Sequence, residues 1–256
     1  MEQRFFVIKN LKKVYNLNTA SEVCALNDIS FTADKGEFIV VVGSNAAGKS
    51  TLFNVIAGSI PPDKGEILLE GKPITGLPEY KRAKFISRVW QNSNNGVVDS
   101  MTVAENLSMA KMRSSSVGLR PSVKHEWKKE FTETLERFHL GLEKRLDDGV
   151  NLLSGGQKQI IALVMATLTH PKLLLLDEHT ASLDTKMNKL VLGVTEKIVR
   201  ENNITALMIT HNINQALQYG DRLILLNRGN IVLDLPKKEK QNISLAAIVE
   251  KMDDYS

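Results

Sequence analysis

The chain has 256 residues, 43% of them hydrophobic, with a formal net charge of +4 at pH 7. This length suffices for one large core or two unequal lobes and excludes two full catalytic domains. The single cysteine, Cys24, excludes an intramolecular disulfide and suits a reducing compartment; we interpret it as a small core residue.

The basic residues are scattered along the chain, which does not favour nucleic-acid binding. We interpret the small basic groups as solvated faces: Lys81, Arg82, Lys84 and Arg88; Lys128 and Lys129; Lys237, Lys238 and Lys240. The start of the chain lacks the apolar segment of an export signal, and no apolar run reaches membrane-spanning length. We therefore expect a cytosolic chain that does not itself cross a bilayer.

Short apolar, β-rich runs crowd the first third of the chain, at residues 5–8, 29–32, 38–42 and 67–69. Turn residues such as Asp34, Lys35 and Gly36 separate them. This pattern predicts an antiparallel sheet wrapped around a core strand.

The run 38–42 leads into the template of glycine, four residues, Gly-Lys-Ser. The loop residues are Gly43, Ser44, Asn45, Ala46, Ala47, Gly48, Lys49 and Ser50, and Thr51 follows. Backbone N–H groups in such a loop, continued by a helix N-terminus, can surround a phosphate. Lys49 adds positive charge for the β- and γ-phosphates, Ser50 offers a hydroxyl to Mg²⁺, and Thr51 assists near the α-phosphate. On this motif alone, a chance glycine turn before a helix stays open.

From about residue 101 to 168 the pattern becomes helical. Thr102 can cap a helix because Glu105 follows three residues later. An aromatic and aliphatic stripe at helical spacing is more typical of a core than of a ligand site; it comprises Trp127, Phe131, Leu135 and Phe138.

Strand and helix patterns then alternate, which predicts a parallel sheet with crossover helices. The expected elements are a strand at 172–177, a helix near 186–201, strands at 205–210 and 222–226 with a helix between them, and an amphipathic helix at 244–252. The helical stretch therefore interrupts an α/β nucleotide-binding core. We expect a β subdomain with the phosphate-loop part of the core in residues 1–92, a helical subdomain in 93–168, and the rest of the core in 169–256.

Four leucines, residues 173–176, are followed by Asp177 and Glu178, as expected for a buried parallel strand whose polar residues lie at its carboxyl end. Neighbouring side chains on a strand point to opposite sides, so the two acids have different tasks. We assign Asp177 to Mg²⁺, through water, and Glu178 to the attacking water as general base. Such a pair seen alone is more often simply solvated, so this assignment depends on the phosphate loop.

The pentapeptide Leu153-Ser154-Gly155-Gly156-Gln157 is the signature of the ATP-binding cassette family, which the chain resembles over roughly residues 5–234. The order of motifs also matches: the phosphate loop, Gln91 after Trp90, the signature, the acid pair, Ser182-Leu183-Asp184, and His211. The resemblance implies an α/β fold with a phosphate-loop NTPase core of RecA type and a mainly parallel sheet. To this core the family adds an N-terminal antiparallel β subdomain and an inserted α-helical subdomain.

The resemblance also implies a role for each further motif. In this family the signature caps ATP held by the opposite subunit, so two chains would enclose two ATP molecules head to tail. His211 would contact the γ-phosphate and orient the attacking water. Asp184 would lie in a loop that crosses the dimer interface, and Gln91 would sense Mg²⁺ and the partner lobe.

Tyr15 stands where the family places an aromatic ring against adenine, with core packing as the alternative. Two residues depart from the family pattern. Ala46 replaces a usual glycine, which is tolerable at negative φ and costly otherwise. His179 replaces a usual proline after the acids, so the turn there is expected to be looser. A catalytic role for His179 beside Glu178 is the alternative reading of that histidine.

The resemblance implies the ATPase subunit of a transporter, bound to a second copy of itself and to two membrane permease subunits at the cytoplasmic face of the cell membrane. ATP and Mg²⁺ are the implied cofactors, a solute-binding protein is a further partner, and no nucleic acid is involved. Motion would pass to the permeases through a groove beside Gln91 and the helical lobe. Residues 145–152 lack the acidic-glycine segment common in exporters, which favours import. Residues 177–184 resemble cassettes of uptake systems for amino acids or similar small solutes.

Two other functions stay open. A soluble cassette ATPase acting on ribosomes or nucleic acid generally has tandem cassettes or a long coiled-coil insertion, and neither is evident here. A non-hydrolysing regulatory nucleotide binder is suggested by Ala46 and His179, and a phosphate-release assay would separate it from an enzyme.

Overall fold

The computed structural model describes residues 4–113 and 125–253. Its strands are β1 (Phe6–Tyr15), β2 (Val23–Ala33), β3 (Phe38–Val42), β4 (Lys64–Leu69), β5 (Lys72–Pro73), β6 (Ile86–Val89), β7 (Leu173–Asp177), β8 (Thr205–Ile209), β9 (Arg222–Asn227) and β10 (Asn230–Leu235). Its α-helices are α1 (Lys49–Ala57), α2 (Glu79–Arg82), α3 (Val103–Met112), α4 (His125–Glu136), α5 (Gly155–Thr167), α6 (Thr185–Glu201), α7 (Ile213–Gln218), α8 (Lys237–Lys240) and α9 (Leu245–Asp253).

The strands form two sheets. A four-stranded antiparallel sheet has the order β2-β1-β4-β5, and a six-stranded sheet has the order β10-β9-β3-β8-β7-β6. In the larger sheet β9, β3, β8, β7 and β6 are parallel, and β10 pairs antiparallel with β9 at one edge. The expected α/β fold with a mainly parallel core sheet and an N-terminal antiparallel sheet is therefore confirmed.

The strand β3 separates two hydrophobic cores. Its side chains alternate between the two faces of the sheet because successive residues of a strand point to opposite sides. Phe38 and Val40 pack in the core that includes α5 and α6, whereas Ile39 and Val41 pack against α1 and the antiparallel sheet. Every residue of β3 is buried, which fixes the start of the phosphate loop.

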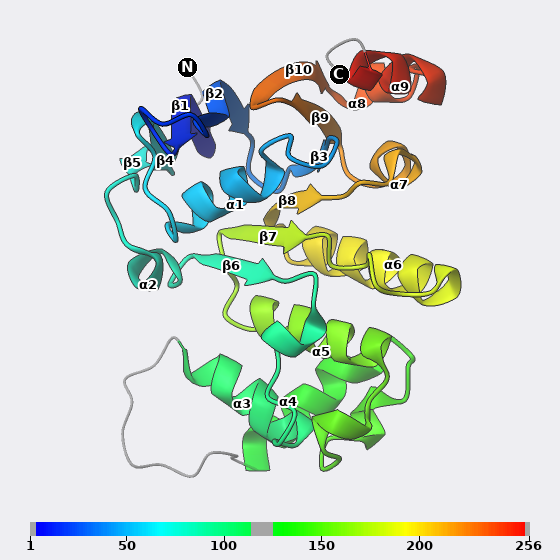
Figure 1. The fold of residues 1–256 in the computed structure, drawn as a ribbon. Helices are drawn as coiled ribbons and strands as arrows, with labels where there is room; N and C mark the ends of the chain where they lie inside the picture. The colour runs from blue at the N-terminus through cyan, green and yellow to red at the C-terminus, as the bar shows by residue number, and fades with distance from the viewer. Residues whose placement is uncertain (1–3, 114–124, 254–256) are drawn as a thin grey trace.

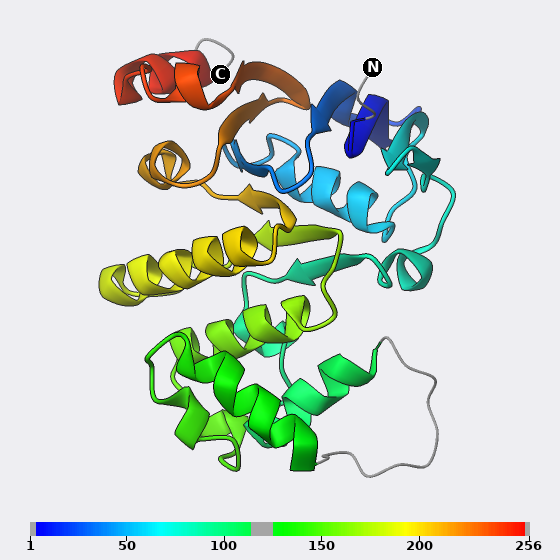
Figure 2. The same ribbon diagram turned by 180° about the vertical axis from the view of Figure 1, so that it is seen from behind.

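The helices α3, α4 and α5 gather at one end of the molecule, opposite the N-terminal strands (Figures 1 and 2). Thr102 and Glu105 form the expected capping box at the start of α3. The expected core stripe on and after α4 is confirmed, because Phe131 and Leu135 are fully buried and Trp127 and Phe138 pack against the same core. No helix in the described ranges is long and apolar enough to cross a membrane.

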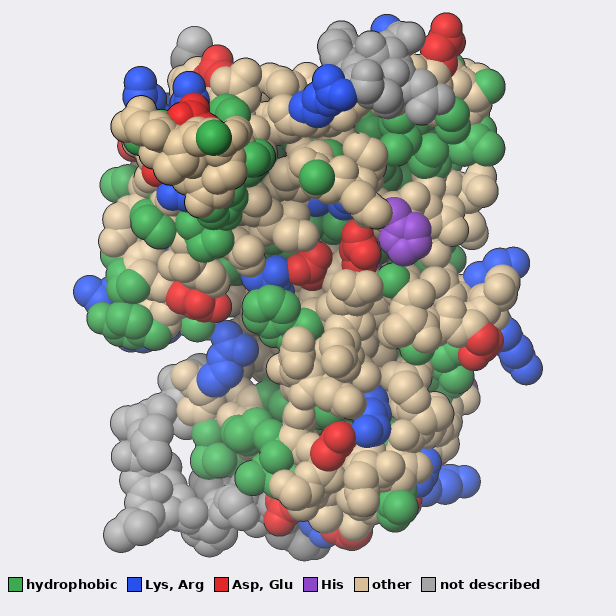
Figure 3. Space-filling model, in the orientation of Figure 1, with side chains coloured by type: hydrophobic (Ala, Val, Ile, Leu, Met, Phe, Trp, Pro, Cys, Tyr) green, Lys and Arg blue, Asp and Glu red, His purple; other side chains and the backbone are tan. Residues whose placement is uncertain are grey.

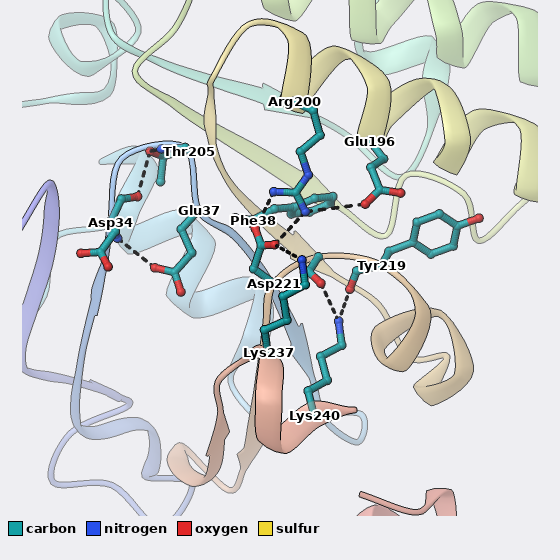
Figure 4. A network of polar contacts seen from close by, with 12 residues as sticks. Asp34, Glu37, Phe38, Glu196, Arg200, Thr205, Tyr219, Asp221, Lys237 and Lys240 are labelled. Atoms are coloured by element: carbon teal, nitrogen blue, oxygen red, sulfur yellow. Dashed lines mark hydrogen bonds and ion pairs between the residues drawn. The ribbon is translucent and has the colours of Figure 1, made fainter. Parts of the chain in front are cut away.

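Charged side chains at the amino edge of the larger sheet form a network of ion pairs and hydrogen bonds (Figure 4). Asp221 accepts from Arg200 of α6, at 2.6 and 2.9 Å, and from the N–H of Phe38 at 3.0 Å. Lys240 donates to the carbonyl oxygens of Tyr219 and Gly220. These contacts join α6, α8, β3 and β9.

Burial corrects several expectations for single residues. Cys24, expected in the core, is exposed on β2. Arg82 and Lys240, expected on solvated faces, are 1% and 4% exposed, and the side chain of Arg88 is 9% exposed. Each is covered because partners far away in the chain accept its hydrogen bonds, among them the carbonyl oxygens of Val55 and Ile56 for Arg82.

Candidate functional site

The phosphate loop connects β3 to α1, and two of its glycines are required by close contacts. At Gly43 a Cβ atom would lie 2.3 Å from the carbonyl oxygen of Leu226. At Gly48, where φ is +101°, a Cβ would lie 2.3 Å from the carbonyl oxygen of Ala25. Both glycines of the sequence template therefore let the loop pass between neighbouring backbones before α1 begins at Lys49.

The sequence left open whether Ala46 has a negative or a positive φ. The structure has the positive φ, which is the unfavourable one for alanine. This φ is +64°, in the left-handed region where a Cβ atom costs about 1 kcal/mol. The side chain is exposed, so no packing contact compensates for this cost. The departure from glycine therefore lowers stability, but it preserves the backbone path of the loop.

Lys49 lies at the first position of α1 and is 6% exposed. Its Nζ donates to the carbonyl oxygens of Gly43 and Ser44, both at 2.9 Å. Burial lowers the pKa of Lys49, and the carboxylates of Glu178 and Asp177 partly offset this effect. The ammonium group is thus held within the loop, beside the N–H groups that α1 leaves free at its start.

A cavity of about 310 Å³ lies over the phosphate loop, and its lining includes Tyr15, Ala25, Asn45, Lys49 and Glu178. Tyr15 is the last residue of β1 and is half-buried at this cavity rather than in either core. The ammonium of Lys13 lies 5.8 Å from the centre of its ring. The geometry therefore brings Tyr15, the loop and Glu178 around one space.

The carboxyl edge of the larger sheet brings Asp177, Glu178 and His211 together. Asp177 is the last residue of β7, and Glu178 follows with a left-handed φ of +44°. Glu178 Oε2 lies 3.5 Å from Nδ1 of His211, which follows β8; their side chains are 21% and 58% exposed. Figure 3 shows acidic side chains and a histidine next to each other near the middle of this face. A second cavity of about 300 Å³ adjoins Glu178 and His211 between α6 and α7.

His179 does not belong to this group. Its side chain is 1% exposed, and Nε2 lies 3.0 Å from Oγ1 of Thr195 on α6. Burial lowers the pKa of His179 to about 4, so the ring is neutral at pH 7. The catalytic alternative for His179 is therefore wrong, because the ring is directed into the core beneath α6.

The signature lies at the start of α5, where Ser154 is the N-cap. Its side chain accepts from the N–H of Gln157, whose side chain accepts in return from the N–H of Ser154. Ser154 and Gly155 are exposed, whereas Gly156 packs so closely on Met187 that a Cβ would lie 2.1 Å from its Cγ. Among the described residues, the signature adds none to the lining of the cavity over the phosphate loop.

Asp184 and Gln91 occupy loops beside these elements. Asp184 is the N-cap of α6, and its Oδ1 accepts from the N–H groups of Lys186 and Met187. Gln91 is exposed, two residues after the end of β6. In a single chain neither residue lines the cavity over the phosphate loop.

Arg88 and Trp90 are site residues that the sequence analysis did not identify. Arg88 donates to Asp177 Oδ2 at 2.5 Å and to Asn54 Oδ1 of α1 at 2.7 Å. Its guanidinium carbon lies 3.7 Å from the centre of the Trp90 ring. The sequence offered one signal for these two residues, their position: Arg88 lies two residues before Trp90, and Trp90 directly precedes Gln91.

The donor set fits Mg²⁺ held mainly by phosphate oxygens. Ser50 offers an exposed hydroxyl, and the Asp177 side chain, 15% exposed, offers a carboxylate. Within residues 4–113 and 125–253, no group of three or more His, Cys, Asp or Glu could hold a metal ion. Mg²⁺ in nucleotide sites takes one or two protein oxygens plus phosphates and water, so these residues suit it without a protein cage.

Comparisons with known proteins agree on one family. The family model described as ABC transporter matches residues 26–181. The chain is 46% identical over 246 residues to the tyrosine transport ATP-binding protein of Clostridioides difficile, which covers 96% of this chain and 98% of that protein. It is 35% identical to the methionine import ATP-binding protein MetN of Corynebacterium efficiens, over 88% of this chain and 60% of MetN.

Solved structures show the same architecture. The ADP conformation of MJ1267, an ATP-binding cassette of an ABC transporter, superimposes with a TM-score of 0.81 at 27% identity, covering 97% of this chain and 98% of that one. A dimeric post-hydrolysis cassette, MJ0796 bound to ADP and Pi, superimposes with a TM-score of 0.76 at 27% identity. That match covers 91% of this chain and 98% of that one.

Proposed function

The chain belongs to the ABC transporter family as an ATP-binding and ATP-hydrolysing subunit, and we propose that it drives the uptake of tyrosine or a related amino acid through separate permease subunits. The match to the tyrosine transport ATP-binding protein supports this substrate class, because 46% identity extends over nearly the whole of both chains. The methionine import relative points to the same class of solute.

The proposed nucleotide site uses the phosphate loop and the β1–β2 side of the cavity. Lys49 would exchange its two carbonyl partners for phosphate oxygens, whose negative charge offsets the effect of burial on its pKa. Tyr15, which lines the same cavity, would stack on adenine. Ser50 and Asp177 would hold Mg²⁺, which when bound neutralises charge on the phosphates.

Hydrolysis is proposed to depend on Glu178 and His211. The carboxylate would take a proton from the attacking water, and the imidazole would orient that water and contact the γ-phosphate. Their separation of 3.5 Å lets one water molecule contact both side chains. Asp177 pairs with Arg88, whereas Glu178 lies beside His211, so the two adjacent acids have different partners.

The site is proposed to be completed by a second copy of the chain. Ser154 and Gly155 are exposed at the positive end of α5, where free N–H groups favour a phosphate. Gln91 and Asp184 would contribute to the contact between the two copies. The assembly would be held at the cytoplasmic face of the membrane by two permeases, with a solute-binding protein as a further component.

Transport by the purified complex tests the substrate proposal. The chain would be co-purified with its permeases in detergent and reconstituted in vesicles. Uptake of labelled tyrosine and methionine would be compared with uptake of spermidine, a polyamine and so a solute of another class. ATP-dependent accumulation of tyrosine above the other two is expected, and Glu178→Gln should abolish it. Accumulation of spermidine but of neither amino acid would contradict the substrate class and leave the ATPase function intact.

A further inference from the structure

Arg88 connects four elements that meet behind the nucleotide site. It lies on β6, and its guanidinium bonds Asn54 on α1 and Asp177 on β7. The same group stacks on Trp90, whose carbonyl oxygen accepts from Nε2 of Gln159 on α5 at 3.1 Å. Gln159 is 2% exposed and lies on the helix that begins at the signature. A continuous chain of contacts thus runs from the acid assigned to Mg²⁺ to the signature helix.

The geometry at Asp177 leaves one carboxylate oxygen for the ion. Arg88 bonds Oδ2, whereas Oδ1 has no hydrogen bond to any described residue. An arginine that holds one oxygen of a carboxylate fixes the direction of the other. The Asp177 carboxylate cannot turn without breaking its 2.5 Å ion pair with Arg88.

The burial of Arg88 costs folding free energy, and this cost points to a functional reason for the contact. The side chain is 9% exposed, and its Nε is buried without a hydrogen-bond partner among residues 4–113 and 125–253. A buried donor left unpaired is unfavourable, and native structures contain few of them. The flat guanidinium is nevertheless kept between an acid, an amide and an indole ring, an arrangement that lysine does not reproduce.

We propose that Arg88 is a positioning residue that orients Asp177 toward Mg²⁺ and transmits Mg²⁺–nucleotide binding to Trp90 and the signature helix. An Asp177 carboxylate that also holds the ion would bind Arg88 more weakly, and the guanidinium would then shift against the Trp90 ring. Because Trp90 is bonded to Gln159, that shift reaches α5 within the same chain. This inference depends on the proposed Mg²⁺ role of Asp177.

The test uses the two tryptophans of the chain, Trp90 and Trp127. In a Trp127→Phe background, Trp90 is the only indole, so its emission reports the Arg88 contact. A non-hydrolysable ATP analogue would be titrated into the protein, once in Mg²⁺ and once in EDTA. The affinity for the analogue in Mg²⁺ divided by that in EDTA is the Mg²⁺ enhancement. The matched control is Arg222→Met, because Arg222 also lies on a strand of this sheet and bonds an aspartate, Asp234, at 2.5 Å.

Arg88→Met should lower the Mg²⁺ enhancement by about tenfold, change the affinity without Mg²⁺ by less than about twofold, and remove the Trp90 response to the Mg²⁺-bound analogue. Arg88→Lys should restore part of the enhancement but not the Trp90 response. Arg222→Met should lower the melting temperature and leave both readouts unchanged.

Unchanged enhancement and an unchanged Trp90 response in Arg88→Met would overturn the inference, whatever happens to its melting temperature. Equal losses of affinity with and without Mg²⁺ would overturn it as well, since they indicate general damage. If Arg88→Met does not fold, Arg88→Lys decides, and wild-type values for both readouts would overturn the inference. A wild-type protein without any Mg²⁺ enhancement would instead overturn the proposed role of Asp177, and the inference with it.

Discussion

The two edges of the larger sheet use charged side chains in opposite ways. At the amino edge Asp221 is closed in by Arg200, Lys237 and the N–H of Phe38 (Figure 4). At the carboxyl edge Glu178 and His211 lie 3.5 Å apart, and the histidine side chain is 58% exposed. The charge of Asp221 is satisfied within the chain, whereas Glu178 and His211 are available to a ligand.

Left-handed backbone occurs at both edges, as at Asn203 before β8, where φ is +48°. Ala46 and Glu178, both at the carboxyl edge, have left-handed φ values of +64° and +44°. Lys49 at that edge has a pKa lowered by burial, whereas Arg200 at the amino edge has a pKa raised by its hydrogen bond to Asp221. Burial also lowers the pKa of Lys240 at the amino edge, to about 8, so the two edges differ in the exposure of their charged groups and not in the presence of strain.

The largest expected effect is on hydrolysis. Glu178→Gln should lower the rate of ATP hydrolysis by about 10² to 10⁴, the usual contribution of a general base, with little change in stability. Phosphate release and nucleotide affinity would both be measured, and the affinity should persist. A rate of hydrolysis near the wild-type value would show that Glu178 is not the general base.

The next effect concerns acid stability beneath the carboxyl edge. The pKa of His179 falls from 6.5 to about 4 on burial, so the unfolded chain binds its proton at higher pH than the folded chain does. The free energy of unfolding should therefore fall as pH decreases from 6.5 to 4, by about 3 kcal/mol in total. His179→Gln, which keeps a donor for Thr195, should remove this slope in urea unfolding measured at several pH values. The exposed His139→Gln is the control, and an equal change of slope there would refute the assignment.

A smaller effect is expected at the amino edge. Burial raises the pKa of Asp221, but the hydrogen bonds from Arg200 and Phe38 outweigh it and leave the pKa below its ordinary value. Asp221→Asn should lower the free energy of unfolding by about 2 kcal/mol, because Arg200 and Lys237 lose a common partner. Nucleotide affinity should not change. Asp34→Asn, in the exposed pair with Arg4, should cost less than about 0.5 kcal/mol. Equal losses of unfolding free energy in the two variants would show that the network at Asp221 stabilises the fold no more than the exposed pair at Asp34 does.

The smallest effect tests the backbone of the phosphate loop. Ala46→Gly should raise the free energy of unfolding by up to about 1 kcal/mol, because glycine accepts a φ of +64°. Ala47→Gly, at a buried alanine one residue later, should lower it by about 1 kcal/mol. Thermal unfolding of both variants measures the difference, and a loss of stability in both would mean that Ala46 is not strained.

Local patterns determined much of what the sequence predicted. Gly43 and Gly48 are required by backbone contacts at 2.3 Å, and the spacing of the template encodes those contacts. The Thr102 capping box depends on residues three apart. Such features need no knowledge of the rest of the chain, so they were found without it.

Features set by distant contacts were missed. The strand β6 has four residues, two of them Ser87 and Arg88, and so gives no strong β pattern. Arg88 is buried by Asn54 and Asp177, which lie 34 and 89 residues away in sequence. Its charge suggested a solvated face because nothing nearby in sequence indicates which element covers it. The roles assigned to the signature and to Asp184 remain predictions, since they depend on a second chain.

The exposed position of Cys24 has a practical consequence. It is the sole thiol of the chain and lies on β2 between Val23 and Ala25, both of which line the cavity over the phosphate loop. A maleimide dye or nitroxide would attach at one defined point per copy without prior mutagenesis. Pulsed dipolar spectroscopy on such labelled protein would measure how far apart two copies lie, before and after nucleotide is added.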